Sequence, residues 1–318
     1  LATSSFRFKG RVVLITGGSR GLGLALARRF AREGARLILV ARTASELDTA
    51  RHELRSAGAD VVTFVADLTR PRDCERLIDD VMAFVVRLDV LVNNAGVIQA
   101  GPFDCASTED FDESLAIHFW APFHLIRAAL PYLPRGDGRI INISSIGGRL
   151  AVPHLLPYCV GKFALAALSD GLTHELAPQG ISVLTATPGL MRTGSHRNVK
   201  VRGNHEAEAR LFALACSSSL TSMDVDRAAR QIIDASRQRL TRVTPGIQAS
   251  AAEAANALAP ELTSAIATLV AHLLPRPGRK PDADTAVWSR DLDLGWVTGL
   301  FPSETARRMN QPPARGEA

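Results

Sequence analysis

The chain has 318 residues, of which 46% are apolar and 22% are charged, and its formal net charge is +5. This length and apolar content are those of a globular chain with a large core, and they argue against a disordered protein. The excess positive charge comes from scattered arginines without a basic run interleaved with aromatic residues, so the composition argues against nucleic-acid binding.

Cysteine and histidine are too dispersed to suggest a metal site. The four cysteines, Cys74, Cys105, Cys159 and Cys216, form no CxxC pair, and the eight histidines form no cluster with zinc spacing. We therefore expect no metal, and free thiols in a reducing compartment. No apolar run approaches the ~18–20 residues needed to span a bilayer, and the N-terminal LATSSFRFKG has no apolar signal-peptide core. These features predict a cytoplasmic protein without a membrane span.

Strand-like and helix-like segments alternate along the chain. The strand-like runs are Val12–Ile15, Leu37–Val40, Val61–Val65, Val90–Val92, Arg139–Ile143 and Ser182–Ala186. The helix-like segments include Ala44–Ala57, Pro71–Arg87, Thr108–Leu133, Tyr158–Ala177 and Val225–Arg239. Such alternation predicts βαβ units and, because crossovers are right-handed, a doubly wound parallel sheet of the α/β class.

The first strand leads into a glycine-rich turn, Thr16-Gly17-Gly18-Ser19-Arg20-Gly21-Leu22-Gly23, and a helical pattern follows at once. Strand, glycine turn and helix are the context in which this kind of turn binds a pyrophosphate. The glycines permit a tight turn and a close approach of the backbone, and the helix N-terminus supplies N–H donors. The segment therefore predicts a dinucleotide site.

Further candidate site residues follow the other strands. Asp67 comes after the third strand, Asn93 after the fourth, Ser145 after the fifth and Pro188 after the sixth. Ligands bind a doubly wound sheet beyond the carboxyl ends of its strands. We therefore expect these residues to converge with the glycine turn on one site.

Tyr158 and Lys162 lie four residues apart, and Ser145 precedes the tyrosine by 13 residues. Residues at i and i+4 share one face of a helix, so the phenol and the ammonium can point into the same site. A nearby ammonium favours the phenolate and is expected to lower the pKa of the tyrosine. The spacing therefore predicts a tyrosine that exchanges protons, with Ser145, rather than the neighbouring Ser144, hydrogen-bonding a substrate oxygen.

Several motifs in one order give a family resemblance. TGxxxGxG, then Asn93-Asn94-Ala95-Gly96, then Ser145, Tyr158 and Lys162, then Pro188-Gly189 resemble the compact short-chain dehydrogenases/reductases over about Phe8 to Thr193. The resemblance implies a Rossmann fold and hydride transfer from NADPH to a carbonyl carbon, with Tyr158 as general acid. The implied cofactor contacts are Thr16, Gly17, Ser19, Arg20, Gly21, Leu22, Gly23, Arg42, Asp67, Leu68, Asn94, Ala95, Gly96, Tyr158, Lys162, Pro188, Gly189 and Thr193.

The resemblance also implies individual roles. Asp67 would bind the adenine, although a helix N-cap is the competing interpretation. Thr193 would contact the nicotinamide carboxamide, and Lys162 the ribose. The end of the second strand bears on the choice of dinucleotide, because an acidic residue there binds a ribose 2′-hydroxyl and a basic one a 2′-phosphate. Ala41 stands where the family's NAD users have Asp, and Arg42 and Arg20 offer two guanidinium groups, so we expect NADP(H).

His118 is a departure from the family pattern. It stands where the family usually has an asparagine that supports a water relay to the lysine. A histidine also accepts and donates hydrogen bonds, and it titrates near neutral pH. His118 is therefore a candidate catalytic residue, and a packed helix histidine is the alternative.

The segment between serine and tyrosine, Leu150–Leu156, is mostly apolar and favours an apolar ketone or aldehyde over a sugar, unless its leucines belong to the core. In the family, the region from Gly194 to about Met223 covers the substrate. A regulatory protein that binds the cofactor with little turnover is the alternative function. A lyase or epimerase is a third, and it is disfavoured by the glycine spacing and by the lack of a separate substrate domain.

Beyond the last strand, residues 249–318 extend past the family's usual end. They contain an Ala/Leu-rich helical stretch, Ala249–Leu274, and then a region rich in Pro, Asp and Arg. We assign 1–248 to one cofactor-binding and catalytic domain and 249–318 to a helical C-terminal extension packed on it, with contacts expected from Trp288, Trp296 and Phe301. Thr108–Leu133 and Tyr158–Ala177 carry more apolar residues than one core-facing stripe needs, and this predicts a homodimer, with a homotetramer as the alternative. Examples of these residues are Phe119, Trp120, Phe123, Phe163, Leu165 and Leu168. Many members of the family form tetramers through a C-terminal edge strand, and we expect the extension to cover that edge here.

Overall fold

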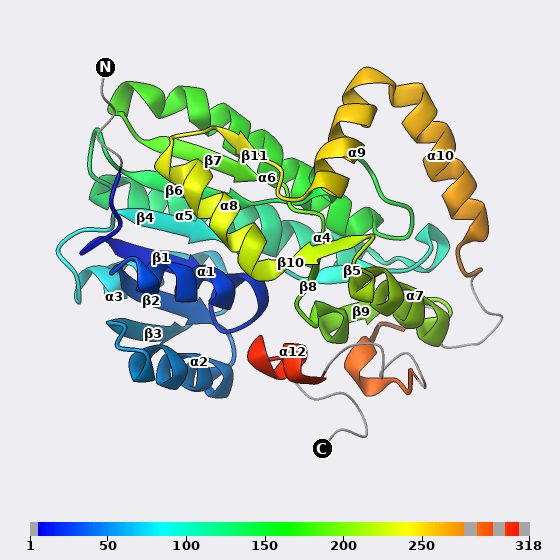
Figure 1. Cartoon of the computed structure of the whole chain (residues 1–318), viewed down its shortest axis with the longest axis horizontal. Helices are drawn as coiled ribbons and strands as arrows, with labels where there is room; N and C mark the ends of the chain where they lie inside the picture. Colours follow the sequence, from blue (N-terminus) through cyan, green and yellow to red (C-terminus); the bar gives the residue numbers. More distant parts are fainter. Residues whose placement is uncertain (1–5, 277–284, 295–302, 312–318) are drawn as a thin grey trace.

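The computed structural model describes residues 6–276, 285–294 and 303–311 (Figure 1). Its centre is a seven-stranded sheet in the order β11-β7-β6-β4-β1-β2-β3, in which every neighbouring pair is parallel. The strands are β1 (Val12–Thr16), β2 (Arg36–Ala41), β3 (Val61–Val65), β4 (Val90–Asn93), β6 (Arg139–Ile143), β7 (Ser182–Ala186) and β11 (Arg242–Val243). The predicted doubly wound parallel sheet is confirmed.

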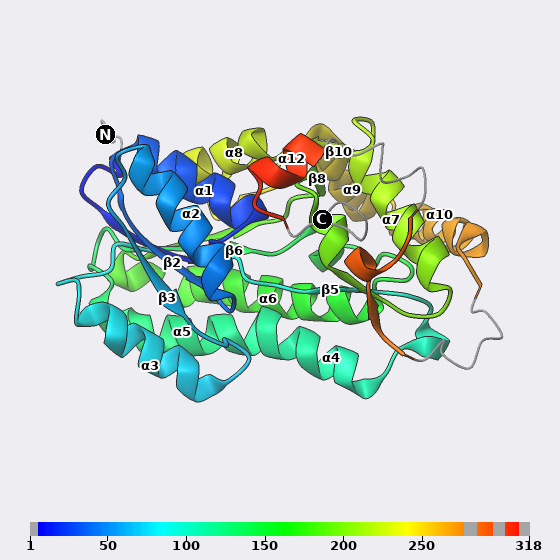
Figure 2. The same ribbon diagram turned by 90° about the horizontal axis from the view of Figure 1, so that it is seen from below.

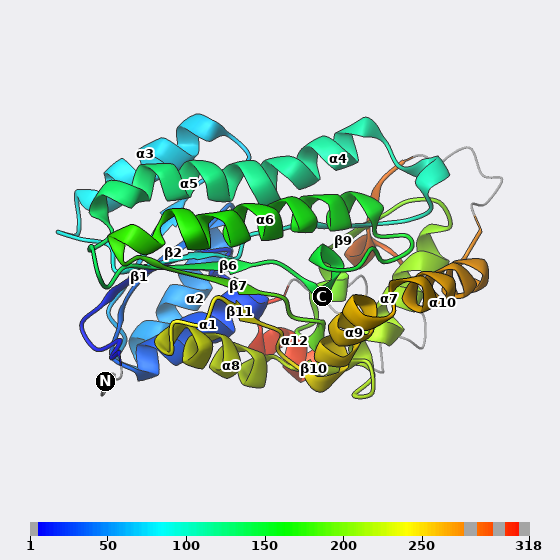
Figure 3. The ribbon, with the colours of Figure 1, turned by 90° about the horizontal axis from the view of Figure 1, so that it is seen from above.

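Side chains of alternate residues in the central strands pack in two separate cores, one on each face of the sheet. Val13 and Ile15 of β1 pack in the core that holds α1 (Gly21–Arg32), α2 (Ala44–Ser56) and α8 (Val225–Arg237). Val12 and Leu14 pack in the opposite core. That face is covered by α3 (Pro71–Met82), α4 (Thr108–Leu115), α5 (Ala121–Ala129) and α6 (Leu156–Glu175). Figures 2 and 3 show these two helical layers with the sheet between them.

Two helices differ from the sequence-based prediction. α3 ends at Met82 instead of Arg87, and Val86, near the end of the predicted helix, is fully exposed. The long helix predicted over Thr108–Leu133 is divided by a π-helical segment, Ala116–Trp120, and closes in a 3-10 turn, Leu130–Tyr132, that contains Pro131. Pro131 has no backbone N–H with which to continue the helical hydrogen bonds, which explains this end. A π-helical segment inside an α-helix is frequently found at a functional site, and His118 lies in this one.

Smaller elements lie beyond the carboxyl ends of the central strands, on the right of Figure 1. β5 (Ile98–Ala100), β9 (Val199–Val201) and β12 (Val287–Trp288) form a three-stranded sheet, and β8 (Leu190–Arg192) pairs with β10 (Ser222–Asp224). Between β9 and β10 lies α7 (His205–Ser217), the helix expected in part of Gly194–Met223. These elements build the region over the site.

The extension folds as separate pieces. Its predicted helix over Ala249–Leu274 is divided into α9 (Ile247–Leu258) and α10 (Pro260–Leu273) at Pro260, which begins the second helix. Lys200 Nζ and Arg290 Cζ lie 5.1 and 4.9 Å from the centroid of the Trp288 ring. Trp296 and Phe301 lie outside the described residues. The last described helix, α12 (Ser303–Arg308), lies beside α1 (Figure 2). Within the described part of the chain, no helix is long and apolar enough to cross a bilayer.

Candidate active site

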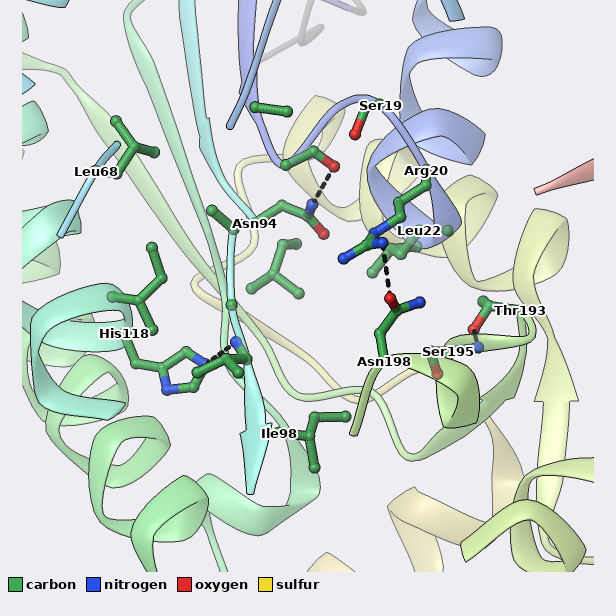
Figure 4. A pocket seen from close by; sticks show the side chains of 18 of the residues that line it. Ser19, Arg20, Leu22, Leu68, Asn94, Ile98, His118, Thr193, Ser195 and Asn198 are labelled. Atoms are coloured by element: carbon green, nitrogen blue, oxygen red, sulfur yellow. Dashed lines mark hydrogen bonds between the residues drawn. The ribbon is translucent and has the colours of Figure 1, made fainter. Parts of the chain in front are cut away.

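A cavity of about 280 Å³ gathers the predicted site residues where β1, β4, β6 and β7 end (Figure 4). Every predicted site residue lines it except Thr16, Gly23, Asp67 and Asn93. The side-chain amide of Asn93 is buried and donates to Asn142 Oδ1 at 2.8 Å. The residues that follow four separate strands therefore converge, as the parallel sheet requires.

The glycine turn has the geometry of a close backbone cradle. Gly17 has φ +62°, and a Cβ added at Gly23 would lie 2.0 Å from the carbonyl oxygen of Gly17. Only glycine fits such an approach, and it brings the N-terminus of α1 to the cavity wall. The turn and helix therefore fit a dinucleotide pyrophosphate.

Thr16 and the asparagine turn hold this cradle in place. The hydroxyl of Thr16 donates to Val92 O and accepts from the backbone N–H groups of Asn94 and Ala95, at 2.9 and 3.1 Å. The side-chain amide of Asn94 donates to the carbonyls of Thr16 and Gly17. Thr16 thus acts behind the cavity wall by joining β1 to the turn after β4.

Ser145, Tyr158 and Lys162 all line the cavity. Ser145 lies just after β6, its Oγ accepts from Gly147 N, and its hydroxyl is near enough to Tyr158 to act on the pKa of the phenol. Lys162, one turn after Tyr158 on α6, donates from Nζ to Ile143 O at 2.8 Å. Ser144 instead donates its hydroxyl proton to Lys162 O. The arrangement places two hydroxyls and one amine on the same side of the cavity.

Burial moves the pKa values of tyrosine and lysine in opposite directions. It raises the pKa of Tyr158 from 10.0 to about 12, although the hydrogen bond from Ser145 acts to lower it. It lowers the pKa of Lys162 from 10.5 to about 7. The sequence-based expectation of a lowered tyrosine pKa is therefore wrong. Loss of solvent has the largest effect on the pKa of Tyr158, and it also favours the neutral form of the neighbouring Lys162 amine.

His118 is fixed at both ring nitrogens. Its Nε2 accepts from Val97 N at 3.3 Å, so Nδ1 carries the proton, and that nitrogen lies 3.1 Å from Ser114 Oγ. The Ser114 hydroxyl donates onward to Pro157 O on α6. Burial, and then the charge of Lys162, lower the pKa of His118 well below its ordinary value. His118 is therefore a neutral ring that joins three segments of the site.

The part of the cavity beside Arg20 contains a carboxylate, Glu46, that the sequence analysis missed. Arg20 Nη1 lies 3.2 Å from Glu46 Oε1 and donates to Asn198 Oδ1 at 2.8 Å, while Ser19 Oγ donates to Glu46 Oε2. Arg42 lies at the cavity and is exposed. Within the described structure, Arg42 has no hydrogen bond or ion pair, so it is the guanidinium best placed to meet an added anion.

Asp67 lies beside the cavity without lining it. Its Oδ1 accepts from the backbone and hydroxyl of Thr69 at 3.2 and 2.7 Å. Burial acts to raise the pKa of Asp67, but these hydrogen bonds and the charges of Arg42 and Arg70 outweigh it and lower the pKa. The N-cap position of α3 is Arg70, so Asp67 shapes the turn before that helix.

The cavity wall also includes residues that the motif spacing did not indicate. They are Thr43, Glu46, Ala66, Thr69, Val97, Ile98, Glu113, Ile117, Ile143, Met191, Ser195, Asn198, Trp288 and Gln311. Some neighbour a motif, but Trp288 and Gln311 come from the extension. No local pattern could have revealed those two, because their positions depend on how the chain returns over the sheet.

The apolar segment Leu150–Leu156 does not line the cavity. Leu155 packs against the core of β9 and α7, and His154 Nδ1 lies 2.7 Å from Glu208 of α7, a buried residue. The segment thus holds α7 in position. Among the described residues, no group of three or more His, Cys, Asp or Glu side chains is arranged to hold a metal ion.

Comparison with known proteins agrees with this geometry. Residues 11–202, more than half of the chain, match the family model for short chain dehydrogenase. The chain belongs to the short-chain dehydrogenase/reductase family. The glycine turn, Asn93–Gly96 and the Ser145, Tyr158 and Lys162 set all fall within the matched residues.

Individual members of the short-chain dehydrogenase/reductase family differ in substrate. The chain is 38% identical over 188 residues to 11-beta-hydroxysteroid dehydrogenase 1A of Arabidopsis thaliana, covering 58% of this chain and 53% of that protein. It thus spans about half the length of that relative. A short-chain dehydrogenase from Streptomyces avermitilis is 31% identical with TM-score 0.68, covering 85% and 96% of the two chains. L-sorbose reductase from Gluconobacter frateurii, solved with NADPH and L-sorbose, is 26% identical with TM-score 0.68, covering 77% and 98%.

Proposed function

We propose that this family member is an NADP(H)-dependent oxidoreductase that interconverts a carbonyl and an alcohol, with Tyr158 as the general acid and base. The observation that supports this most strongly is the convergence of Ser145, Tyr158 and Lys162 with the glycine cradle on one cavity. A nicotinamide dinucleotide in that cavity would supply the hydride. Each remaining step is a task for side chains of this chain.

In the reducing direction, Tyr158 gives its phenolic proton to the substrate oxygen. A pKa of about 12 keeps that proton on the tyrosine at neutral pH. Ser145 lies within hydrogen-bonding reach of Tyr158 and donates to the same oxygen as charge develops on it. Lys162, held by Ile143 O, turns toward the cavity, where an ammonium supports the phenolate left behind. Oxidation of an alcohol uses the same groups in reverse.

His118 has a positioning role in this proposal. Its two ring nitrogens are occupied by Val97 and Ser114, and its low pKa keeps it neutral. The contact to Val97 fixes the turn after Gly96, and the contact through Ser114 fixes the start of α6 just before Tyr158. His118 therefore orients cavity walls and passes no proton.

The preference for NADP(H) rests on Arg42 and Ala41. Arg42 lies exposed at the cavity, and Ala41 has no carboxylate to bind a 2′-hydroxyl. Glu46 would oppose a 2′-phosphate, but its charge is offset by Arg20 at 3.2 Å. L-sorbose reductase, a similar protein, was solved with NADPH.

An apolar carbonyl or alcohol is the proposed substrate class. Ile98, Ile117, Met191 and Trp288 line the cavity, and a hydroxysteroid dehydrogenase is among the relatives. Leu150–Leu156, from which this class was first predicted, gives no support, because it lies outside the cavity. Glu113 on the same wall is the feature that would suit a polyhydroxylated substrate such as a sugar.

A panel of carbonyl substrates tests the proposal. We would follow NADPH and NADH oxidation with steroid ketones, medium-chain ketones and aldehydes, and keto-sugars, using the full chain. Turnover of an apolar ketone with NADPH is the expected result. Turnover confined to keto-sugars would overturn the substrate class. Tight NADPH binding without turnover of any carbonyl would favour the regulatory alternative.

A further inference from the structure

The C-terminal segment Met309–Gln311 lies directly on the glycine turn. Gly21 N, at the start of α1, donates to Met309 O at 3.0 Å. Asn310 Nδ2 donates to Ser19 O at 2.8 Å and to Glu46 O at 2.9 Å. Two consecutive residues of the extension are therefore hydrogen-bonded to the turn that the proposed function assigns to the cofactor.

This attachment is anchored in the core. Met309 and Ala306 are fully buried, and Met309 belongs to the core shared by α1 and α8. Arg28 of α1 holds the segment from the side by donating to Arg308 O and to Met309 Sδ. The segment is thus a fixed part of the wall.

Gln311 is the residue of this segment that lines the cavity. Its Oε1 accepts from Asn198 Nδ2 at 2.6 Å, which fixes the orientation of its amide. Its Nε2 lies 3.4 Å from the position of a Cβ added at Gly21, alongside the first turn of α1. Among the described residues, no acceptor takes a hydrogen bond from this Nε2.

Two N–H sources therefore face the same part of the cavity. Gly21 N is bonded to Met309 O, so the backbone N–H groups that α1 offers here are those of Leu22 and Gly23. With the positive end of the helix dipole, they suit a phosphate anion. The Gln311 amide adds a side-chain donor beside them. Gln311 also lies against Gly194, next to Thr193, so its position joins the turn at α1 to the segment after β8.

We propose that Gln311 is a dinucleotide-binding residue whose side-chain amide donates a hydrogen bond to the cofactor pyrophosphate. This inference rests on the proposed function, because it requires a dinucleotide in the cavity. The family match ends at residue 202, so the contact comes from a part of the chain outside the matched region. Asn198 serves as the positioning residue, since it holds Gln311 and also accepts from Arg20 and Arg290.

Charge variants of Gln311 in the full chain test this. Gln311→Glu replaces the donor with a carboxylate facing the phosphates, and we expect its Kd for NADP⁺ to rise by about tenfold at low salt, with a smaller effect at high salt. Gln311→Lys keeps a donor and adds a positive charge, so its Kd should stay equal to that of the wild type or fall. Calorimetric titration with NADP⁺ and with NAD⁺ measures both without any substrate.

Arg307→Gln is the matched control. It changes the net charge by the same single negative unit, and Arg307 is an exposed residue of α12 away from the cavity. Its Kd should equal that of the wild type, and the melting temperatures of all three variants without cofactor should agree. Equal weakening in the Glu and Lys variants would mean that Gln311 only packs, and would overturn the inference.

Two other outcomes are decisive. Tighter binding of NADP⁺ by Gln311→Glu would mean that the Met309–Gln311 segment hinders the dinucleotide, and it would also overturn the inference. Wild-type Kd values in both Gln311 variants would overturn it and leave the proposed function intact. If the wild-type protein binds neither dinucleotide, the proposed function fails, and this inference fails with it.

Discussion

Lys162 Nζ lies 5.7 Å from the centroid of the Tyr158 ring, and burial moves the pKa values of the two side chains in opposite directions. The raised pKa favours the protonated phenol at neutral pH, and burial favours the neutral form of the lysine amine. In the proposed reaction, proton donation to a carbonyl oxygen needs a protonated phenol, so we expect this pair to favour reduction at neutral pH. Oxidation needs the phenolate and should gain from higher pH.

Tyr158→Phe tests the acid directly. The change removes the phenolic proton and keeps the ring, so turnover should fall by about 10²–10⁴ while the Kd for the dinucleotide stays the same. Tyr132→Phe is a matched control, because Tyr132 is the other tyrosine of the chain and lies outside the cavity. Turnover close to wild type in Tyr158→Phe would contradict the assigned role.

The lowered pKa of Lys162 predicts a pH dependence of stability. Between pH 7 and about 10 the unfolded chain keeps a proton that the folded chain has lost, so the free energy of unfolding rises with pH through this group. The slope is at most about 1.4 kcal/mol per pH unit. Lys162→Met removes this contribution. In urea unfolding, the free energy of unfolding of the wild type should therefore rise with pH relative to that of the variant. Lys9→Met, at an exposed position, should run parallel to the wild type.

The local parts of the site could be predicted from the sequence because each depends on neighbours in the chain. The glycine turn follows β1 directly, and Tyr158 and Lys162 share one turn of α6. A parallel sheet then brings the ends of different strands together. That physical rule placed Ser145 and Pro188 beside the glycine turn correctly.

Residues brought in by distant segments could not be predicted in this way. Glu46 meets Arg20 only because α2 begins beside the glycine turn, and Gln311 reaches Asn198 across 113 residues of chain. The direction predicted for the tyrosine pKa was wrong for a related reason. The spacing of Tyr158 and Lys162 indicates a nearby amine, but only the packed structure shows how far solvent is removed from the phenol. Contacts and burial set by tertiary structure leave no local pattern.

Arg42→Asp tests the cofactor preference. It removes the guanidinium with no partner among the described residues and adds a charge that repels a 2′-phosphate, so the ratio of kcat/KM for NADPH to that for NADH should reverse. Arg32→Asp makes the same charge change at an exposed position outside this cavity and should leave the ratio unchanged. An unaltered ratio in Arg42→Asp would mean that the phosphate is held elsewhere.

His118→Ala separates positioning from proton transfer. The variant leaves the N–H of Val97 without its acceptor and opens space in the core, so the free energy of unfolding should fall by about 2–4 kcal/mol. The kcat of the folded fraction should change less than threefold, and its pH profile should keep its shape. A large loss of kcat at unchanged stability would instead assign His118 to the proton relay.

Trp120 and Phe163 give the last prediction, which concerns assembly. They are 48% and 42% exposed on the adjoining π-helical segment and α6, and Trp120 packs on Phe119 and Phe123. Leu165, assigned from sequence to the same surface, is buried in the structure. Such an aromatic surface is unusual on a monomer, so we expect a two-fold homodimer.

Light scattering at micromolar concentration should give the dimer mass for the wild type and the monomer mass for Trp120→Glu combined with Phe163→Glu. Val86→Glu, which alters a fully exposed apolar residue elsewhere, should remain dimeric. A monomeric wild type would refute this interface, and a tetramer would mean that the C-terminal extension leaves the β11 edge open for a second contact.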